Sequence, residues 1–162
     1  VKFSKKKYEQ KLLVRVAISR KGISDLLIAP SGLAINGEVY KEKCIEQRLV
    51  PFVNDHHKND DIIFWPDLAS SHYAEEVTGT LIFEKFDYVE KYENPANLPE
   101  CRPIERFWSI LKSKVYARNW KAKNLNQLEQ RIRQVQRKYR KKICNRFLIA
   151  CYVKLGMQPD TV

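Results

Sequence analysis

The feature that most constrains the fold is a short apolar run that ends at a proline and an acid. Residues 60–65 begin with two aspartates and continue as Ile-Ile-Phe-Trp, β-branched and aromatic side chains that favour a buried strand. Pro66 ends the strand, and Asp67 follows it before a helix that Ser70 or Ser71 is expected to cap. In open α/β sheets, ligands and metals gather at the carboxyl ends of strands, so Asp67 is a candidate functional carboxylate.

A second stretch, residues 91–108, leads into a helix. Its first part is rich in proline and asparagine and is predicted to be a loop. Pro103 suits the first position of a helix over 103–119, because its missing N–H costs nothing there. Glu105 falls in the first turn of that helix, where the positive end of the helix dipole favours its ionised form.

Two carboxylates, one after a strand and one at a helix start, are able to converge on a divalent metal. Mg²⁺ is held by few carboxylates and keeps waters or substrate phosphates in its other positions. A pair of such ions about 4 Å apart would hold the attacking and leaving oxygens of a phosphodiester. The alternative is that Asp67 is a turn or capping residue and Glu105 an ordinary first-turn glutamate.

The order of these residues resembles the Tc1/mariner superfamily of cut-and-paste DNA transposases. Residues 66–72 read Pro-Asp-x-Ala-x-x-His, and residues 94–108 read Asn-Pro-x-x-x-Pro-x-x-x-Pro-Ile-Glu-x-x-Trp. In that family the second catalytic acid lies in the first motif and the third in the second motif. The resemblance, which covers about residues 14–121, therefore makes Asp67 and Glu105 catalytic metal ligands, with 37 residues between them.

The resemblance also implies a fold, an activity and partners. It implies an RNase H-like mixed sheet flanked by helices, a cofactor of Mg²⁺ or Mn²⁺ used as two metal ions, DNA partners (transposon ends and target), a homodimer of the full-length protein and a nuclear location. The expected function is metal-dependent DNA strand cleavage and strand transfer by a catalytic-domain fragment. The alternative is a transposase-derived, catalytically inactive DNA-binding or assembly module.

Two departures from the family support that alternative. The family's first catalytic Asp lies on an earlier strand, and no Asp precedes Asp25 here, so the chain is expected to be part of a longer protein and to be inactive alone. Arg15 stands where the family usually has Trp. In the predicted strand over 11–19 we expect this arginine to be a solvated edge residue.

The chain is predicted to divide at residue 122. Residues 1–122 form the RNase H-like core without its first strand, and residues 123–162 form a basic helical extension packed on the core. The core has predicted strands at 11–19 and 23–29, which form a hairpin, and at 60–65 and 87–90. Its predicted helices are 37–57, which Asn36 can cap, 71–86, and 103–119. The last helix has a predicted buried face: Ile104, Phe107, Trp108, Leu111 and Val115. The second helix is expected to bury Ile82, and Pro51 to kink or restart the first. A long helix should run from 124 to 146, with Asn124 and Gln127 resembling a capping box at its start. Residues 147–155 should fold back as a separate helix.

The positive charge is uneven along the chain. The net charge is +11, and residues 119–162 carry +9 of it, which favours a polyanionic partner, although basic faces also serve solubility. The candidate DNA-binding residues lie on the long helix: Arg131, Arg133, Arg137, Lys138, Arg140, Lys141 and Lys142. The same helix carries an apolar stripe that predicts either core packing or a dimer contact: Leu125, Leu128, Ile132, Val135 and Tyr139.

The remaining features indicate a folded domain without a membrane span. Hydrophobic residues make up 44% of the chain, and no apolar run approaches the length that crosses a membrane. The four scattered cysteines predict neither a zinc site nor a disulfide framework. His56 and His57 are expected at the surface. His72 is a candidate supporting residue of the site, with a local structural bond favoured over a DNA contact, and Trp108 is expected to be a core anchor.

Overall fold

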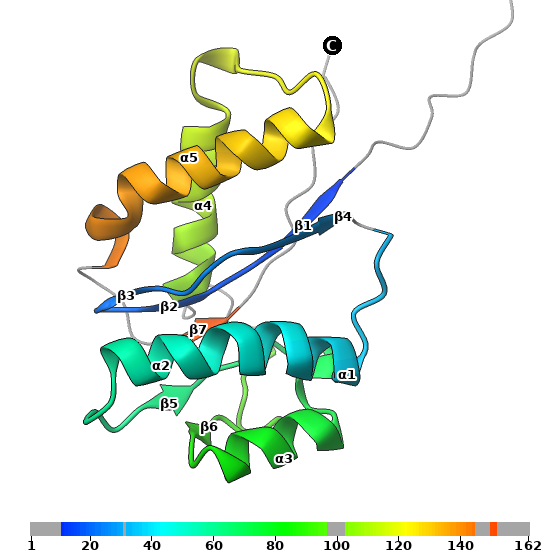
Figure 1. Ribbon diagram of the computed structural model, residues 1–162, viewed down its shortest axis with the longest axis vertical. Coiled ribbons are helices and arrows are strands. Elements are labelled where there is room, and N and C mark those ends of the chain that lie inside the picture. The colour runs from blue at the N-terminus through cyan, green and yellow to red at the C-terminus, as the bar shows by residue number, and fades with distance from the viewer. Residues whose placement is uncertain (1–10, 31, 97–102, 145–149, 152–162) are drawn as a thin grey trace, which may run out of the picture.

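A computed structural model describes residues 11–30, 32–96, 103–144 and 150–151 of the 162-residue chain. A β-hairpin runs through the middle of the molecule, with one pair of helices on one side and the remaining helices and a small parallel sheet on the other (Figure 1). The strands described form three small sheets, with the orders β1-β4, β3-β2-β7 and β5-β6. Antiparallel and parallel pairs both occur, as a mixed α/β fold requires, but these strands do not join into one continuous sheet.

The hairpin has two arms, each interrupted once. The first arm contains β1 (Leu12–Arg15) and β2 (Ala17–Ser19), and the second contains β3 (Gly22–Ile23) and β4 (Leu27–Pro30). At the interruption the Ala17 N–H donates to the Ser24 hydroxyl at 2.9 Å, which replaces a ladder bond between backbones. The predicted hairpin is therefore confirmed.

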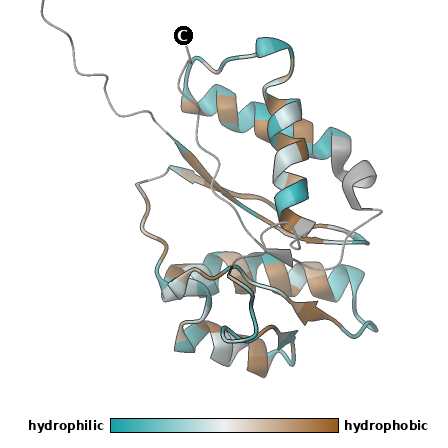
Figure 2. Cartoon of the chain, turned by 180° about the vertical axis from the view of Figure 1, so that it is seen from behind, coloured by the Kyte–Doolittle hydropathy of each residue, from teal (hydrophilic) through white to brown (hydrophobic). Residues whose placement is uncertain are grey.

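Both faces of the first arm are covered. Because successive side chains of a strand point to opposite faces, Val14, Val16 and Ile18 pack in one core cluster, and Ala17 belongs to a second. Figure 2 shows the hairpin strands coloured mainly as hydrophobic, whereas the long helix α5 alternates hydrophilic and hydrophobic residues.

A long helix covers the second face of the hairpin. It consists of α1 (Gly37–Tyr40), a π-helical segment η1 (Lys41–Leu49) and α2 (Val50–His56), and Figure 1 shows them as one continuous rod. The Asn36 side chain accepts from the Val39 N–H at 2.9 Å, so the predicted cap is confirmed. Pro51 was predicted to kink or restart the helix. The π-helical turns end at Leu49 and α-helical turns begin at Val50, with Pro51 in their first turn, so the restart is confirmed and the kink is wrong (Figure 1).

The helix end also corrects the prediction for one of the adjacent histidines. His57 is 5% exposed. Its Nε2 lies 2.7 Å from the Ser19 hydroxyl, and its Nδ1 lies 2.7 Å from Oδ2 of Asp60. The expected surface position is therefore wrong for His57, because the hairpin turn packs against the end of α2.

A parallel pair of strands follows. β5 (Ile63–Phe64) pairs with β6 (Asp87–Tyr88), and the crossover contains the 3₁₀ turn η2 (Ser70–His72) and helix α3 (Glu75–Phe83). Both strands are shorter than predicted, and the predicted helix over 71–86 is divided in two.

Two details of the crossover differ from prediction. The residues before η2 and α3 are Ala69 and Ala74, and neither makes a side-chain cap, so capping by Ser70 or Ser71 is wrong. Ile82 is 66% exposed rather than buried, since α3 buries its other side.

Helices α4 (Pro103–Val115) and α5 (Leu125–Cys144) cover the first face of the hairpin, joined through the 3₁₀ turn η4 (Ala117–Asn119). The α-helix ends before the predicted residue because Arg118 and Asn119 adopt left-handed backbone angles. The predicted buried face of α4 is confirmed, and Trp108 is 2% exposed. The members of that face are Ile104, Phe107, Trp108, Leu111 and Val115.

The start of α5 and its apolar stripe follow the prediction. Gln127 N–H donates to Asn124 Oδ1 at 2.9 Å, and Gln127 Oε1 accepts from Lys123 N–H at 2.7 Å. Leu128 and Ile132 are buried in the same cluster as α4, so the stripe packs in the core. The Tyr139 side chain lies outside the described residues.

The segment after α5 contains a strand. β7 (Ala150–Cys151) pairs antiparallel with β2, so the helix predicted over 147–155 is wrong at these two residues, and its other positions lie outside the described part. The division at residue 122 stays a prediction. Among the residues described, no helix combines the length and the apolar character needed to cross a membrane.

Candidate functional site

Asp67 lies in a turn just beyond β5. Phe64 and Pro66 before it are buried, whereas the Asp67 side chain is 28% exposed. Its Oδ1 accepts the Ala69 N–H at 2.8 Å, so the carboxylate does stabilise the turn, as the alternative reading expected. This position at the end of a strand is the one that the sequence predicted, but the strand is only partly buried, since Ile63 is 60% exposed.

The turn η2 places His72 beside the Asp67 carboxylate. His72 Nδ1 lies 2.7 Å from Asp67 Oδ1, and the imidazole is fully buried. The ring also packs on Tyr40 of α1, with 4.1 Å between the ring centroids. The predicted supporting role of His72 therefore takes the form of a direct contact with Asp67.

Arg15 of β1 reaches the other side of the imidazole. Arg15 Nη1 lies 2.6 Å from His72 Nε2, and Arg15 is 9% exposed. Its guanidinium carbon also lies 5.3 Å from the centre of the Tyr40 ring. The predicted solvated position of Arg15 is wrong, because the strand is covered on both faces.

The three side chains define the protonation of the site. Arginine has only donors, so His72 Nε2 must accept, and the ring proton lies on Nδ1, facing Asp67. Burial raises the pKa of Asp67, but the hydrogen bond and charge of His72, the Ala69 N–H and the charge of Arg15 together hold that pKa below its ordinary value of 3.8. Asp67 is therefore ionised at neutral pH.

Asn94 joins the two sequence motifs. It is 5% exposed, and its Oδ1 accepts from Trp65 Nε1 at 3.0 Å. Its Nδ2 lies 2.7 Å from the Pro66 carbonyl and 2.8 Å from the Tyr73 hydroxyl. The first residue of the second motif is thus hydrogen-bonded to residues that precede and follow Asp67 in the chain. Sequence reasoning did not anticipate this role, although an asparagine opening a proline-rich loop was a signal.

Glu105 lies in the first turn of α4 and is half-buried. Its neighbours Ile104 and Phe107 are fully buried in the cluster that contains β1 and β2, so this turn is anchored on the hairpin. Residues 97–102, between Asn94 and α4, lie outside the described part. Convergence of Asp67 and Glu105 stays a prediction. The described ranges contain no cluster of three or more His, Cys, Asp or Glu side chains that could hold a metal.

The candidate DNA-binding residues of α5 fall into three groups. Arg131 lies 5.4 Å from the centre of the Trp120 ring and donates to the Val115 carbonyl at 3.4 Å, so it joins α5 to the end of α4. Arg133 pairs with Glu129 at 2.8 Å. Arg137 and Lys138 are exposed. The side chains of the remaining candidates lie outside the described residues: Arg140, Lys141 and Lys142.

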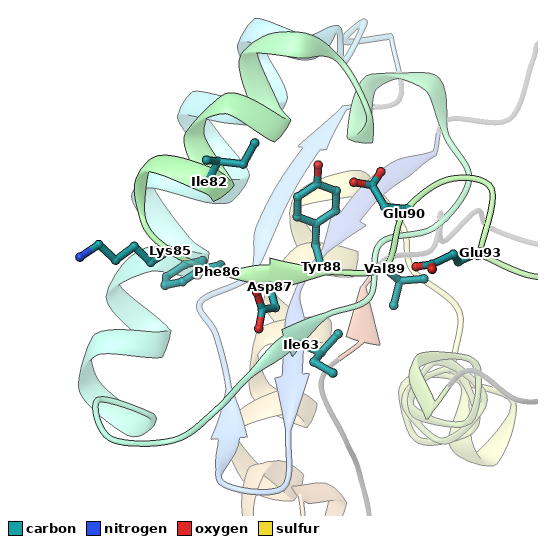
Figure 3. A pocket seen from close by; sticks show the side chains of 9 residues that line it. All are labelled: Ile63, Ile82, Lys85, Phe86, Asp87, Tyr88, Val89, Glu90 and Glu93. Carbon is teal, nitrogen blue, oxygen red and sulfur yellow. The ribbon is translucent and has the colours of Figure 1, made fainter.

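A surface groove runs beside β5 and β6 (Figure 3). Ile63 and Ile82 contribute apolar surface to it, and Asp87, Glu90 and Glu93 contribute carboxylates. Burial, together with the neighbouring Glu90, raises the pKa of Tyr88 in the same groove. Three carboxylates disfavour phosphate there, so the groove is a poor candidate for a DNA contact.

The fold is similar to the crystal structure of the catalytic domain of Mos1 mariner transposase, with a TM-score of 0.56 and 16% sequence identity over 90% of this chain and 76% of that chain. The predicted resemblance is thus confirmed at the level of the fold. Comparison of sequences finds no matching family model and no matching curated protein.

Proposed function

We propose that this chain is the greater part of the catalytic domain of a Tc1/mariner-type DNA transposase, acting in metal-dependent DNA strand cleavage and strand transfer. The observation that carries the proposal is the position of Asp67 just beyond β5, where its carboxylate contacts His72 and the Ala69 N–H. Its position agrees with the motif, and the fold agrees with a mariner catalytic domain. A nuclear location and a homodimer of the full-length protein are part of the proposal.

The chemistry of Asp67 fits a divalent cation. Within the described residues, both polar contacts of its carboxylate use Oδ1, so Oδ2 is the oxygen available to a metal on the partly exposed side. Glu105 is the proposed second ligand. A bound pair of Mg²⁺ or Mn²⁺ ions would neutralise charge on a phosphodiester and activate water or a 3′-hydroxyl.

Other residues of the chain would orient the metal ligands and bind DNA. His72 holds Asp67, Asn94 holds the loop that leads to Glu105, and the exposed Arg137 and Lys138 of α5 would bind DNA phosphates.

The second candidate is an inactive DNA-binding or assembly module. It is favoured by Arg15 in place of the family's usual Trp and by the high positive charge of residues 119–162. The two candidates differ in one respect, since only the enzyme needs a third acid from elsewhere in the full-length protein.

Metal titration tests the proposed ligands. Mn²⁺ is titrated into wild type, Asp67→Ala, Glu105→Ala and the matched control Asp61→Ala, which removes an exposed carboxylate near β5. We expect each ligand variant to bind at least about tenfold more weakly and the control to bind like wild type. Equal binding by all four proteins would reject the metal role.

A nicking assay distinguishes an active transposase from an inactive DNA-binding module. Full-length protein is mixed with transposon-end DNA, with and without Mg²⁺. Metal-dependent nicking that Asp67→Ala abolishes supports the enzyme. DNA binding without nicking supports the inactive module.

A further inference from the structure

A continuous row of buried side chains connects the hairpin to the strand end. Arg15 contacts His72 at 2.6 Å, and His72 contacts Asp67 at 2.7 Å. The imidazole is fully buried and the arginine is 9% exposed, so water does not replace these contacts. Tyr40 lies against both the ring of His72 and the guanidinium of Arg15.

We propose that Arg15 is a positioning residue that fixes the His72 ring with its proton on Nδ1 and thereby turns Oδ1 of Asp67 inward and Oδ2 outward. This inference rests on the proposed role of Asp67 as a metal ligand. It assigns a function to the residue at which the chain departs from the family's usual Trp.

The tautomer follows from the chemistry of the arginine. Its guanidinium stays protonated and offers only N–H groups, so an Nε2–H on His72 would place two donors 2.6 Å apart. With the proton on Nδ1, both ring nitrogens have complementary partners. The packing of Tyr40 on the ring opposes rotation that would exchange the two nitrogens.

The orientation of the carboxylate follows from the tautomer. Oδ1 accepts from the backbone of Ala69 at 2.8 Å and faces His72 Nδ1 at 2.7 Å. The hydrogen bond from Ala69 and the close contact with His72 Nδ1 hold the carboxylate in one orientation before a metal arrives. Residues that orient a ligating carboxylate in this way typically change metal affinity by about 10- to 100-fold when mutated.

An apolar side chain at position 15 would no longer fix the tautomer of His72. Arg15→Met keeps much of the volume but offers no donor to Nε2, so both tautomers of His72 become accessible. Arg15→Gln keeps a neutral donor and tests whether the hydrogen bond or the charge matters. Arg20→Met is the matched control, because Arg20 lies exposed in the hairpin turn.

The first experiment reads the His72 ring directly, without metal. Nitrogen-15 NMR of the metal-free 162-residue chain distinguishes the two tautomers. We expect Nδ1–H in wild type, Arg15→Gln and Arg20→Met, and a mixture or Nε2–H in Arg15→Met. A wild-type ring with its proton on Nε2 overturns the proposal, and this measurement decides the question even if Arg15→Met does not fold.

The second experiment measures Mn²⁺ affinity in the same proteins. We expect about tenfold weaker binding by Arg15→Met, and affinity close to wild type for Arg15→Gln and Arg20→Met. Unchanged tautomer and unchanged affinity in Arg15→Met overturn the proposal.

The two experiments separate this inference from the proposed function. If Asp67→Ala leaves Mn²⁺ binding unchanged, the metal role of Asp67 is rejected. The tautomer of His72 in Arg15→Met then decides alone whether Arg15 fixes the ring, with a change supporting that step and no change overturning it.

Discussion

Asn94 shows how one buried polar side chain can join two distant segments. It bonds to the Pro66 carbonyl, 28 residues earlier in the chain, and to the Trp65 indole on the same segment. An amide has both donors and an acceptor, so one residue satisfies a carbonyl and an N–H together. Replacing it leaves buried groups without partners, which costs more than the bonds themselves contribute.

Asn94→Ala should therefore lower the free energy of unfolding by about 2–3 kcal/mol. Urea denaturation of the variant and of wild type measures the difference. Asn54→Ala is the matched control, because Asn54 lies exposed on α2 and should have little effect. Equal midpoints for Asn94→Ala and wild type would show that the amide does not hold the loop.

Among the elements, the hairpin is fastened to the helical layer through two histidines. His72 contacts the guanidinium of Arg15 in β1, and His57 contacts the Ser19 hydroxyl in β2. Asp60 completes the second contact, with Lys21 at 2.6 Å and His57 at 2.7 Å. The hydrogen bond from Lys21, followed by that from His57, lowers the pKa of Asp60 below its ordinary value of 3.8.

The pH dependence follows from the sign of that shift. A carboxyl whose folded pKa is depressed stabilises the fold fully above its ordinary value of 3.8 and loses this contribution as the pH falls through its lower folded pKa. Asp60→Asn should therefore be less stable than wild type at pH 7. The difference in stability should shrink as the pH falls below 3.8. Thermal unfolding from pH 7 to pH 3 measures it, with Asp61→Asn as control. A difference that does not change with pH would contradict the assignment.

At the scale of the whole molecule, charge is separated between two surfaces. The groove beside β5 and β6 carries Asp87, Glu90 and Glu93, whereas α5 presents Arg137 and Lys138 within a chain of net charge +11. A polyanion would therefore approach from the α5 side.

DNA affinity should fall steeply with salt, because each phosphate contact releases counterions. Replacing both Arg137 and Lys138 by Gln should reduce the slope of log K against log salt by roughly 2, if each contacts one phosphate. Fluorescence anisotropy with a duplex at several salt concentrations measures the slope. The double control Lys85→Gln and Lys91→Gln removes the same charge near the acidic groove, and an equal change in slope there would locate binding elsewhere.

The fold was predictable where one pattern decided the structure. The buried face of α4 and the cap of α5 follow from apolar spacing and a capping pair, and both are confirmed. The strand β7 was not predictable, because Ala150 and Cys151 pair with β2, far away along the chain.

The site was predictable in part for the same reason. The position of Asp67 follows from local sequence, and His72 was a candidate by motif. Arg15 was misread because an arginine in a strand usually faces water, whereas here His72 of η2 and Tyr40 of α1 lie against this side chain.

The hairpin at the centre has a consequence for how this protein can vary. An ordinary half-exposed strand tolerates substitution at every second residue, but all eight positions from Leu12 to Ser19 are buried here. Saturation mutagenesis should therefore find an unbroken stretch of intolerance along this strand, without the usual two-residue alternation. Because both faces of the strand are packed, a substitution in either helical layer that alters its contact with the strand should require a compensating change in the other layer.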